Sequence, residues 1–278
     1  MKKIIFLLFT ITFLDARERI IALSPAINEI IFAIGKGDQI VGNTTYASYP
    51  QESQNIYKVG GYFSVSLEKV VSLKPSLILM QKNNLSLKPK FEKLGIKTEF
   101  ISISSLQDIK DSIKKIALLL NEKEKSKKII KDIDQAIKRT KGILENKKIL
   151  IVFGRQFDLK KEIFVSGNGI YFADIIRLSG NKNAFSEQST KQPILSYEGI
   201  IATNPDIIYI LAHNLKKEEE KNLISSWLKL PINAAKTKTI YLTTQKYAGM
   251  PSQRVIKYID DFREVLEDAK SKFTKLQD

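Results

Sequence analysis

The chain has 278 residues and carries 45 Lys and Arg against 30 Asp and Glu, a formal net charge of +15. It has no cysteine, which excludes a disulfide framework and a thiol nucleophile, and its one histidine disfavours a zinc site built from several histidines. A basic chain suits nucleic acid, anionic lipid or an anionic ligand. Because the lysines are scattered along helical patterns, we expect a solvated basic surface and no nucleic-acid partner.

The first 16 residues have the pattern of a signal peptide. Lys2 and Lys3 precede an apolar run at 4–14, and Ala16 is a small residue suited to cleavage. The alternative, a membrane anchor, is disfavoured because a spanning helix needs roughly 20 apolar residues. No cysteine follows the run to carry a lipid. We therefore expect export to the periplasm of a Gram-negative bacterium, cleavage near Ala16 and no lipid anchor.

Residues 17–120 are predicted to form an N-terminal lobe in which strands and helices alternate. Apolar runs of strand length, bounded by turn residues, alternate with segments of helical periodicity. Strands are expected at 20–24, 39–44, 77–81 and 98–103, and helices at 27–34, 68–73 and 85–94. This alternation is typical of βαβ units with a mainly parallel sheet.

The segment 106–147 shows helical spacing only. Its second part, 121–147, is predicted as one long connecting helix, because its isoleucines follow helical spacing with lysines and acids between them. The alternative is an ordinary surface helix. A long helix between two lobes is a stiff connector, so it would limit how far the lobes hinge.

Residues 148–278 repeat the alternation and are predicted to form a C-terminal lobe. Strands are expected at 148–153, 163–166, 207–211 and 239–243, and helices at 171–178 and 251–272. The chain is therefore predicted as an α/β protein of two Rossmann-like lobes with mainly parallel sheets. One long helix joins the lobes, and a ligand cleft lies between them.

Two stretches of the chain, 66–80 and 196–210, share one pattern. The first reads S-L-E-K-V-V-S-L-K-P-S-L-I-L-M and the second S-Y-E-G-I-I-A-T-N-P-D-I-I-Y-I. Each predicts a short helix opened by serine with glutamate two residues on, then a proline and a buried strand. The repeat supports two similar lobes, each with one acidic helix start.

These features together resemble the class III periplasmic binding proteins of ABC importers, the family that carries vitamin B12, ferric siderophores and haem. The motifs that carry the resemblance are L-S-P-A-I-N-E at 23–29, T-Y-A-S-Y-P at 45–50 and L-E-K-V-V-S-L-K-P at 67–75. The resemblance covers nearly the whole chain after residue 16. It implies a non-catalytic protein that captures a metal chelate and delivers it to a membrane permease. The sequence does not indicate an oligomeric state, and a monomer is the default expectation.

In that family each lobe presents a surface glutamate that docks an arginine pocket on the permease. The resemblance places these residues at Glu68 and Glu198. A carboxylate in the first turn of a helix is favoured by the helix dipole and is available to an arginine fork. The alternative is that both are ordinary acids at helix N-termini.

The carboxyl ends of parallel strands define where the ligand is expected. Tyr46 and Tyr62 lie where B12-binding relatives place aromatic residues, and aromatic faces suit a flat macrocycle. The alternative for each tyrosine is a lid over the core. The candidate ligand-binding residues in these loops are Ser24, Pro25, Tyr46, Tyr62, Phe63, Arg155, His213, Lys246 and Tyr247.

His213 and Tyr62 are also the candidate metal ligands. The resemblance implies a histidine after a strand in haem-binding members, opposite a ligand from the first lobe, and imidazole and phenolate both bind iron. Alternatively, His213 is a solvated loop residue. The ligand is then cobalamin on the aromatic faces, or a ferric siderophore held by Arg155, Lys246 and Tyr247.

The sequence leaves haem, ferric siderophore and cobalamin open as ligands, and we expect no intrinsic cofactor. Two other functions stay as alternatives: a lobe pair that serves a sensor or chemoreceptor, and a periplasmic hydrolase. The hydrolase is disfavoured because a single histidine supports no Ser-His-Asp arrangement, and no Gly-rich phosphate loop follows a strand.

Overall fold

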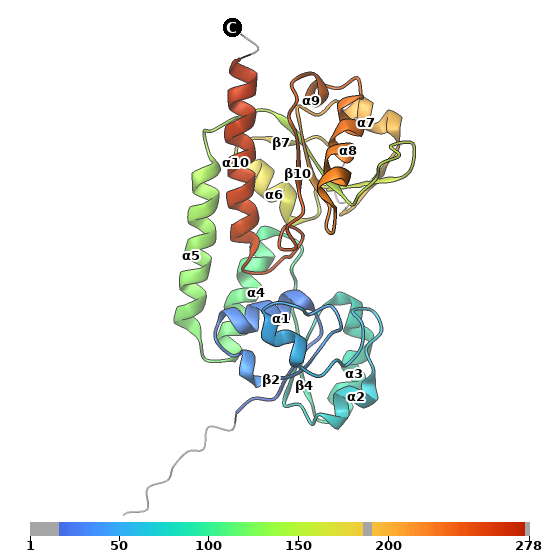
Figure 1. The fold of residues 1–278 in the computed structure, drawn as a ribbon. Coiled ribbons are helices and arrows are strands. Elements are labelled where there is room, and N and C mark those ends of the chain that lie inside the picture. Colours follow the sequence, from blue (N-terminus) through green and yellow to red (C-terminus); the bar gives the residue numbers. More distant parts are fainter. Residues whose placement is uncertain (1–16, 186–190, 276–278) are drawn as a thin grey trace, which may run out of the picture.

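A computed structural model of the chain describes residues 17–185 and 191–275 and shows two α/β lobes, one above the other (Figure 1). The expected signal peptide, residues 1–16, lies outside the described residues. In the part that is described, no helix combines the length and apolar character needed to cross a membrane.

The N-terminal lobe is built on a four-stranded parallel sheet in the order β2-β1-β3-β4. The strands are β1 (Ile20–Ala22), β2 (Ile40–Asn43), β3 (Leu77–Met80) and β4 (Lys97–Phe100). The α-helices between them are α1 (Pro25–Ala33), α2 (Leu67–Ser72) and α3 (Lys88–Lys93), and the 3-10 helices are η1 (Gly37–Gln39), η2 (Gln51–Asn55) and η3 (Lys82–Leu87). The predicted helix at 85–94 is thus η3 followed by α3.

The C-terminal lobe has a mixed sheet in the order β10-β9-β5-β6-β8, with β7 also paired to β5. The pairs β5·β6 and β6·β8 are antiparallel and the other pairs parallel. The strands are β5 (Lys148–Phe153), β6 (Ile163–Val165), β7 (Lys182–Asn183), β8 (Ile194–Leu195), β9 (Ile207–Leu211) and β10 (Ile240–Thr243). The helices are α6 (Tyr171–Leu178), α7 (Tyr197–Thr203), α8 (Lys217–Leu228), α9 (Asn233–Lys236) and α10 (Val255–Thr274).

The predicted long helix is shorter than expected. The structure has α4 (Leu106–Leu119) and then α5 (Lys123–Thr140), so a helix over 121–147 is wrong at both ends. Asn121 between the two helices and Gly142 after α5 have positive φ angles of 58° and 74°. These left-handed conformations break α-helical geometry, which limits α5 to 18 residues.

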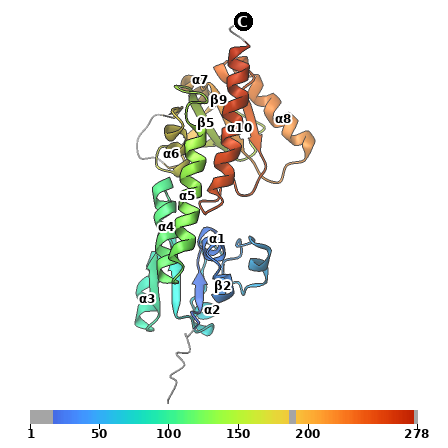
Figure 2. The ribbon, with the colours of Figure 1, turned by 90° about the vertical axis from the view of Figure 1, so that its left-hand side faces the viewer.

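α5 joins the lobes physically. Near its start, Lys125 Nζ donates to the carbonyl of Ile34 in the N-terminal lobe (3.0 Å), and near its end Arg139 pairs with Asp260 of α10 (2.7 Å). α5 packs along both α4 and α10, and Figure 2 shows α5 beside these helices.

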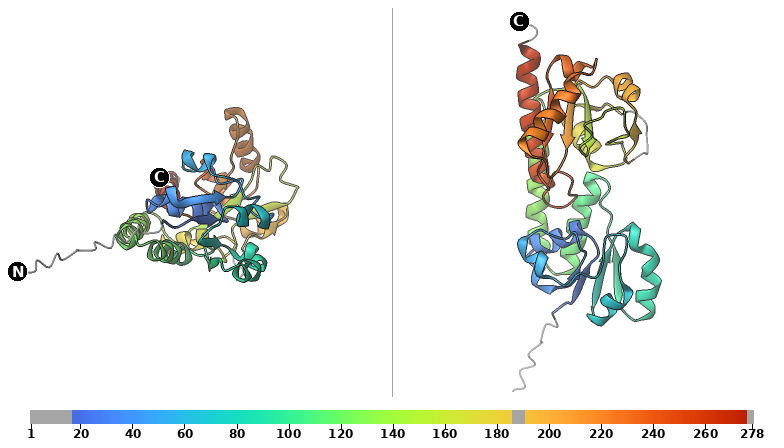
Figure 3. Two further views of the ribbon diagram at one scale, coloured as in Figure 1. Left: turned by 90° about the horizontal axis from the view of Figure 1, so that it is seen from below. Right: turned by 45° about the vertical axis from the view of Figure 1, so that its right-hand side comes forward.

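One apolar core runs through both lobes. It includes Ile20 and Ile30 of the N-terminal lobe, Ile113 of α4, and Ile149 and Phe262 of the C-terminal lobe, all fully buried. Two smaller clusters fill the other face of each sheet. The lobes lie one above the other in the right-hand view of Figure 3 and share this packed core. Large hinge motions would therefore expose apolar surface.

Candidate ligand cleft between the lobes

A cleft of about 590 Å³ has walls from both lobes. Its lining includes no Lys, Arg, His, Asp or Glu among the residues that the structure describes. The N-terminal lobe contributes Ser24, Pro25, Ala26, Tyr46, Gly61, Tyr62, Phe63, Ser64, Gln81 and Ile103, and the C-terminal lobe contributes Met250 and Pro251. Five predicted ligand residues thus meet here: Ser24, Pro25, Tyr46, Tyr62 and Phe63.

Ser24 and Pro25 lie where β1 ends and α1 begins. Pro25 occupies the first turn of α1, where its missing N–H costs nothing. Ser24 has extended backbone and makes no side-chain cap hydrogen bond, although it is buried. This strand-to-helix junction places both residues at the carboxyl end of the parallel sheet, as the sequence predicts.

Tyr62 and Phe63 are carried by a tight turn. Gly61 N–H donates to the carbonyl of Ser64 (3.1 Å), and Gly60 pairs with Val65 in an isolated bridge. Gly60 has φ of +135°, and a Cβ there would lie 2.3 Å from the carbonyl oxygen of Ser64, so only glycine fits. The sequence G-G-Y-F-S therefore builds the turn that carries the two rings.

The aromatic side chains of this wall are exposed. Phe63 is 83% and Tyr46 72% exposed, while Tyr62 is half-buried. The rings of Tyr62 and Phe63 meet edge to face with centroids 4.7 Å apart. Exposed apolar rings gathered in a hollow indicate a binding surface, since large solvent-facing aromatics are otherwise unfavourable.

The Tyr62 hydroxyl donates to Oε1 of Gln81 at 2.5 Å. Burial raises the pKa of the Tyr62 phenol, so it stays protonated at neutral pH. Both features favour a neutral hydroxyl over the phenolate that iron ligation would use. Gln81 directly follows β3, so the strand-end rule that selected the other loops also points to it, although sequence reasoning missed this residue.

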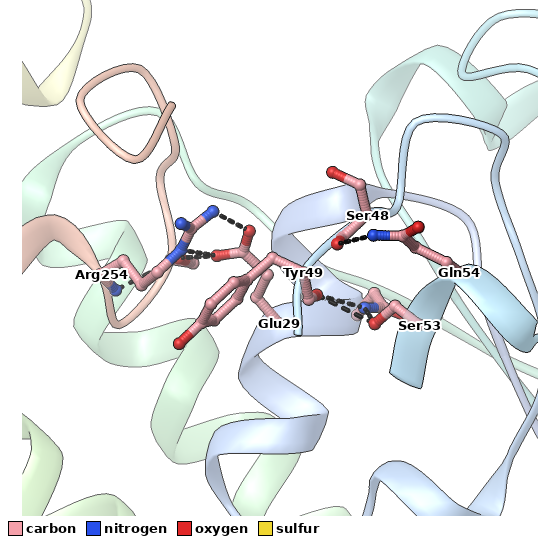
Figure 4. A network of polar contacts seen from close by, with 8 residues as sticks. Glu29, Ser48, Tyr49, Ser53, Gln54 and Arg254 are labelled. Carbon is pink, nitrogen blue, oxygen red and sulfur yellow. Dashed lines mark hydrogen bonds and ion pairs between the residues drawn. The ribbon is translucent and has the colours of Figure 1, made fainter. Parts of the chain in front are cut away.

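The C-terminal wall is held in place by a buried ion pair. Glu29 of α1 is 2% exposed and accepts from the hydroxyl of Ser252 (2.6 Å) and from Arg254 Nε (2.8 Å). Arg254 Nη2 also donates to the second carboxylate oxygen, so the pair is bidentate. Because Ser252 and Arg254 follow Met250 and Pro251, this contact fixes the C-terminal wall against the N-terminal lobe (Figure 4).

Tyr49 extends the same network. Its ring lies under the Arg254 guanidinium, 4.0 Å from ring centroid to Cζ, and its backbone carbonyl accepts from Asn28 Nδ2 (3.0 Å) and Ser53 Oγ (2.9 Å). Figure 4 shows these groups side by side. We name Glu29, Tyr49, Ser252 and Arg254 the inter-lobe clasp. In the sequence, Glu29 and Tyr49 lie within the motifs at 23–29 and 45–50, and no pattern indicates a role for Ser252 or Arg254.

Four predicted ligand residues do not line the cleft. Arg155 is exposed and donates to the Asn214 carbonyl at 3.5 Å, and His213 Nδ1 lies 3.3 Å from the Thr244 carbonyl. Lys246 is exposed. The Tyr247 hydroxyl donates to Asp261 (2.9 Å). Burial, and then this contact with Asp261, raise the pKa of Tyr247 to about 12. Tyr247 instead lines a separate hollow of about 440 Å³ beside β10 and α10.

The residues offer little for a bound metal ion. No group of three or more His, Cys, Asp and Glu side chains in the described ranges is arranged to hold one. Tyr62 lines the cleft and His213 does not, so a metal ligated by both would need further approach of the two loops. His213 and Tyr62 as metal ligands therefore stay a prediction.

A larger groove of about 720 Å³ lies between α4 and α5. Its lining is dominated by lysines of two surface helices, with Lys110 paired to Asp134 at 3.0 Å. We assign the ligand site to the cleft instead. The cleft lies at the strand ends where open α/β sheets bind ligands, and it has aromatic walls.

The two acidic helix starts have matching local structure. Ser66 caps α2 by accepting from Lys69 N–H (3.3 Å), and Ser196 caps α7 by accepting from Gly199 N–H (3.1 Å). Glu68 and Glu198 lie in the first turns and are exposed. Figure 1 shows α2 and α7 in different lobes, on the side away from α5.

Comparison with known proteins gives a consistent result. A family model described as "Periplasmic binding protein" matches residues 20–247. A "Vitamin B12-binding protein" of Vibrio vulnificus is 26% identical over 257 residues, 91% of this chain and 92% of that protein. The structure of a periplasmic vitamin B12 binding protein of Vibrio cholerae superposes with a TM-score of 0.77 at 20% identity, covering 91% of this chain and 98% of that one. A periplasmic heme binding protein of V. cholerae gives 0.75 at 20% identity, with coverages of 90% and 99%.

Proposed function

The chain belongs to the periplasmic binding protein family, and from that premise we propose that it captures a metal chelate in the periplasm and delivers it to the permease of an ABC importer. The relatives are named for binding vitamin B12 or haem, which are both flat metal macrocycles. The observation that carries the proposal is the uncharged cleft lined by Tyr46, Tyr62 and Phe63. Its volume of about 590 Å³ lies in the range of ordinary small-molecule sites.

The mechanism follows from the two walls. The exposed rings give a chelate apolar area and stacking at little entropic cost, because each ring has few rotatable bonds. The inter-lobe clasp and the shared core hold Met250 and Pro251 opposite those rings. The cleft is thus largely preformed, so only a small closure accompanies binding.

Delivery is assigned to Glu68 and Glu198. Each carboxylate is exposed in the first turn of a helix that a serine caps, where an arginine of the permease can donate two hydrogen bonds to it. The lobes present the two helices on the same side, so both docking contacts form at once (Figure 1). Arg155, His213, Lys246 and Tyr247 remain candidates for contacts to the outer edge of the ligand, and the protein is proposed to act as a monomer.

The test is a visible-absorption titration of the protein lacking residues 1–16 with cyanocobalamin, haemin and a ferric tris-catecholate complex. Saturable one-to-one binding of one of them supports the proposal. If none of the three binds, the chelate-carrying function is wrong. A Soret shift on haemin addition that disappears in His213→Ala would assign His213 to the metal, whereas an unaltered spectrum would leave it a loop residue.

A further inference from the structure

Gln81 is a lining residue of the cleft, and the donor half of its side-chain amide is unpaired among the described residues. The side chain is 5% exposed and lines the cleft. Its Oε1 accepts from the Tyr62 hydroxyl, whereas its Nε2 has no hydrogen-bond partner among the described residues. A buried amide donor without an acceptor costs free energy, and native proteins keep few of them.

The bonded end of this amide is held by the Tyr62 turn, which is itself fixed. The backbone carbonyl of Tyr62 accepts from Asn83 Nδ2 (2.5 Å) and Asn84 Nδ2 (3.3 Å), so the turn is held against η3. Because burial raises the pKa of Tyr62, its hydroxyl keeps a proton to donate to Gln81 Oε1. The amide is therefore oriented with its N–H groups away from Tyr62.

We propose that Gln81 Nε2 donates a hydrogen bond to a neutral carbonyl oxygen on the bound chelate, and that this selects chelates with amide side chains over chelates whose only carbonyl groups are carboxylates. The inference rests on the proposed function and names the ligand chemistry of the same cleft.

The charge of the lining decides between neutral and anionic acceptors. A carboxylate over Gln81 would lose its hydration in a cleft whose described lining has no cationic side chain. An amide carbonyl loses much less hydration and satisfies the free N–H equally well. Nε2 has less than 1 Å² of accessible surface, so the proposed contact includes a small movement that uncovers this atom.

The experiment compares two probes on matched variants. Cyanocobalamin carries neutral amide side chains, and haemin carries only carboxylates. Gln81→Leu keeps similar volume and removes the amide, while Gln135→Leu makes the same change on the exposed surface of α5 as a control. We expect the wild-type protein to bind cyanocobalamin more tightly than haemin. Gln81→Leu should lower cyanocobalamin affinity about tenfold and leave haemin affinity unchanged.

A second variant tests the inference in case Gln81→Leu does not fold. Tyr62→Phe removes the hydroxyl that orients the amide, so the expected loss of cyanocobalamin affinity is about threefold. The inference is wrong if folded Gln81→Leu binds cyanocobalamin as tightly as the wild-type protein does. If Gln81→Leu does not fold, the same result in Tyr62→Phe overturns it. So does a wild-type preference for haemin, although the proposed function then stands. Only a wild-type protein that binds none of the three chelates removes the proposed function itself.

Discussion

In the N-terminal lobe the cleft wall is built from regular features, namely the ends of β1 and β3 and a glycine-anchored turn, whereas in the C-terminal lobe it is built from one irregular segment before α10. The first wall has three aromatic rings and a buried amide; the second has Met250 and Pro251. The first is held by contacts within its own lobe, namely the glycine turn and the hydrogen bonds of Tyr62 to Gln81, Asn83 and Asn84. The second is held by the buried clasp between Arg254 and Glu29, which are 225 residues apart.

This difference separates two tasks. We propose that the N-terminal wall recognises the ligand, because its side chains differ in shape and polarity. The C-terminal wall closes the site and depends on the clasp for its position. On their outer sides the lobes are alike instead, because α2 and α7 present the same serine cap and first-turn glutamate.

Removing both docking carboxylates should have the largest effect. The double variant Glu68→Ala, Glu198→Ala should lower chelate uptake in cells to the background level while leaving chelate affinity unchanged, because both groups lie outside the cleft. Glu218→Ala, an exposed first-turn glutamate of α8, is the matched control. Unchanged uptake in the double variant, or a loss of affinity, would show that these glutamates do not dock the permease.

Breaking the clasp should strongly destabilise the protein. Glu29→Ala leaves the Arg254 charge buried and unpaired, so the free energy of unfolding should fall by about 3–5 kcal/mol in a urea titration. Glu124→Ala breaks an exposed pair with Lys127 and should leave the free energy of unfolding close to the wild-type value. If the two variants unfold at the same urea concentration, the clasp does not hold the C-terminal wall.

Truncating the aromatic wall should weaken binding without affecting the fold. Tyr46→Ala and Phe63→Ala should each lower chelate affinity by roughly tenfold, because each removes exposed stacking area from the cleft. Tyr57→Ala, another exposed tyrosine of the same lobe that does not line the cleft, should bind as the wild type does. Equal affinities in calorimetric titrations of all three variants would place the ligand elsewhere.

The smallest effect concerns the cap of α7. Hydrogen bonds from its own backbone N–H and from the Ser196 hydroxyl lower the pKa of Glu198 below its ordinary value of 4.5. The carboxylate therefore stabilises α7 fully above pH 4.5, and this contribution is lost as the pH falls through the lowered pKa. In Ser196→Ala the pKa, followed by NMR titration of the carboxyl carbon, should rise towards 4.5. An unchanged value would mean that the hydroxyl does not contribute.

Much of the N-terminal wall was predictable from sequence. β-α alternation places loops at strand ends, which is how Ser24, Tyr46 and Tyr62 were selected, and the structure brings them together. Gln81 carried the same signal, since it follows β3 directly. The repeat at 66–80 and 196–210 likewise predicted both serine caps correctly, because caps depend only on residues within one helical turn.

The C-terminal wall was not predictable in this way. Met250 and Pro251 are placed by a contact between segments at opposite ends of the chain, and no local periodicity encodes such a pairing. The length of α5 was also wrong, because its isoleucine spacing continues past Gly142 while the backbone there turns left-handed. His213, Arg155, Lys246 and Tyr247 follow strands of the C-terminal lobe, yet none of them lines the cleft.

The most direct test of the account is a crystal structure of the protein with the chelate that binds it in titration. We predict that the chelate lies between the rings of Tyr46 and Tyr62 on one side and Met250 and Pro251 on the other, with α1 and Arg254 still joined through Glu29. A chelate found in the lysine groove between α4 and α5, or in the hollow beside Tyr247, would contradict the assignment of the cleft.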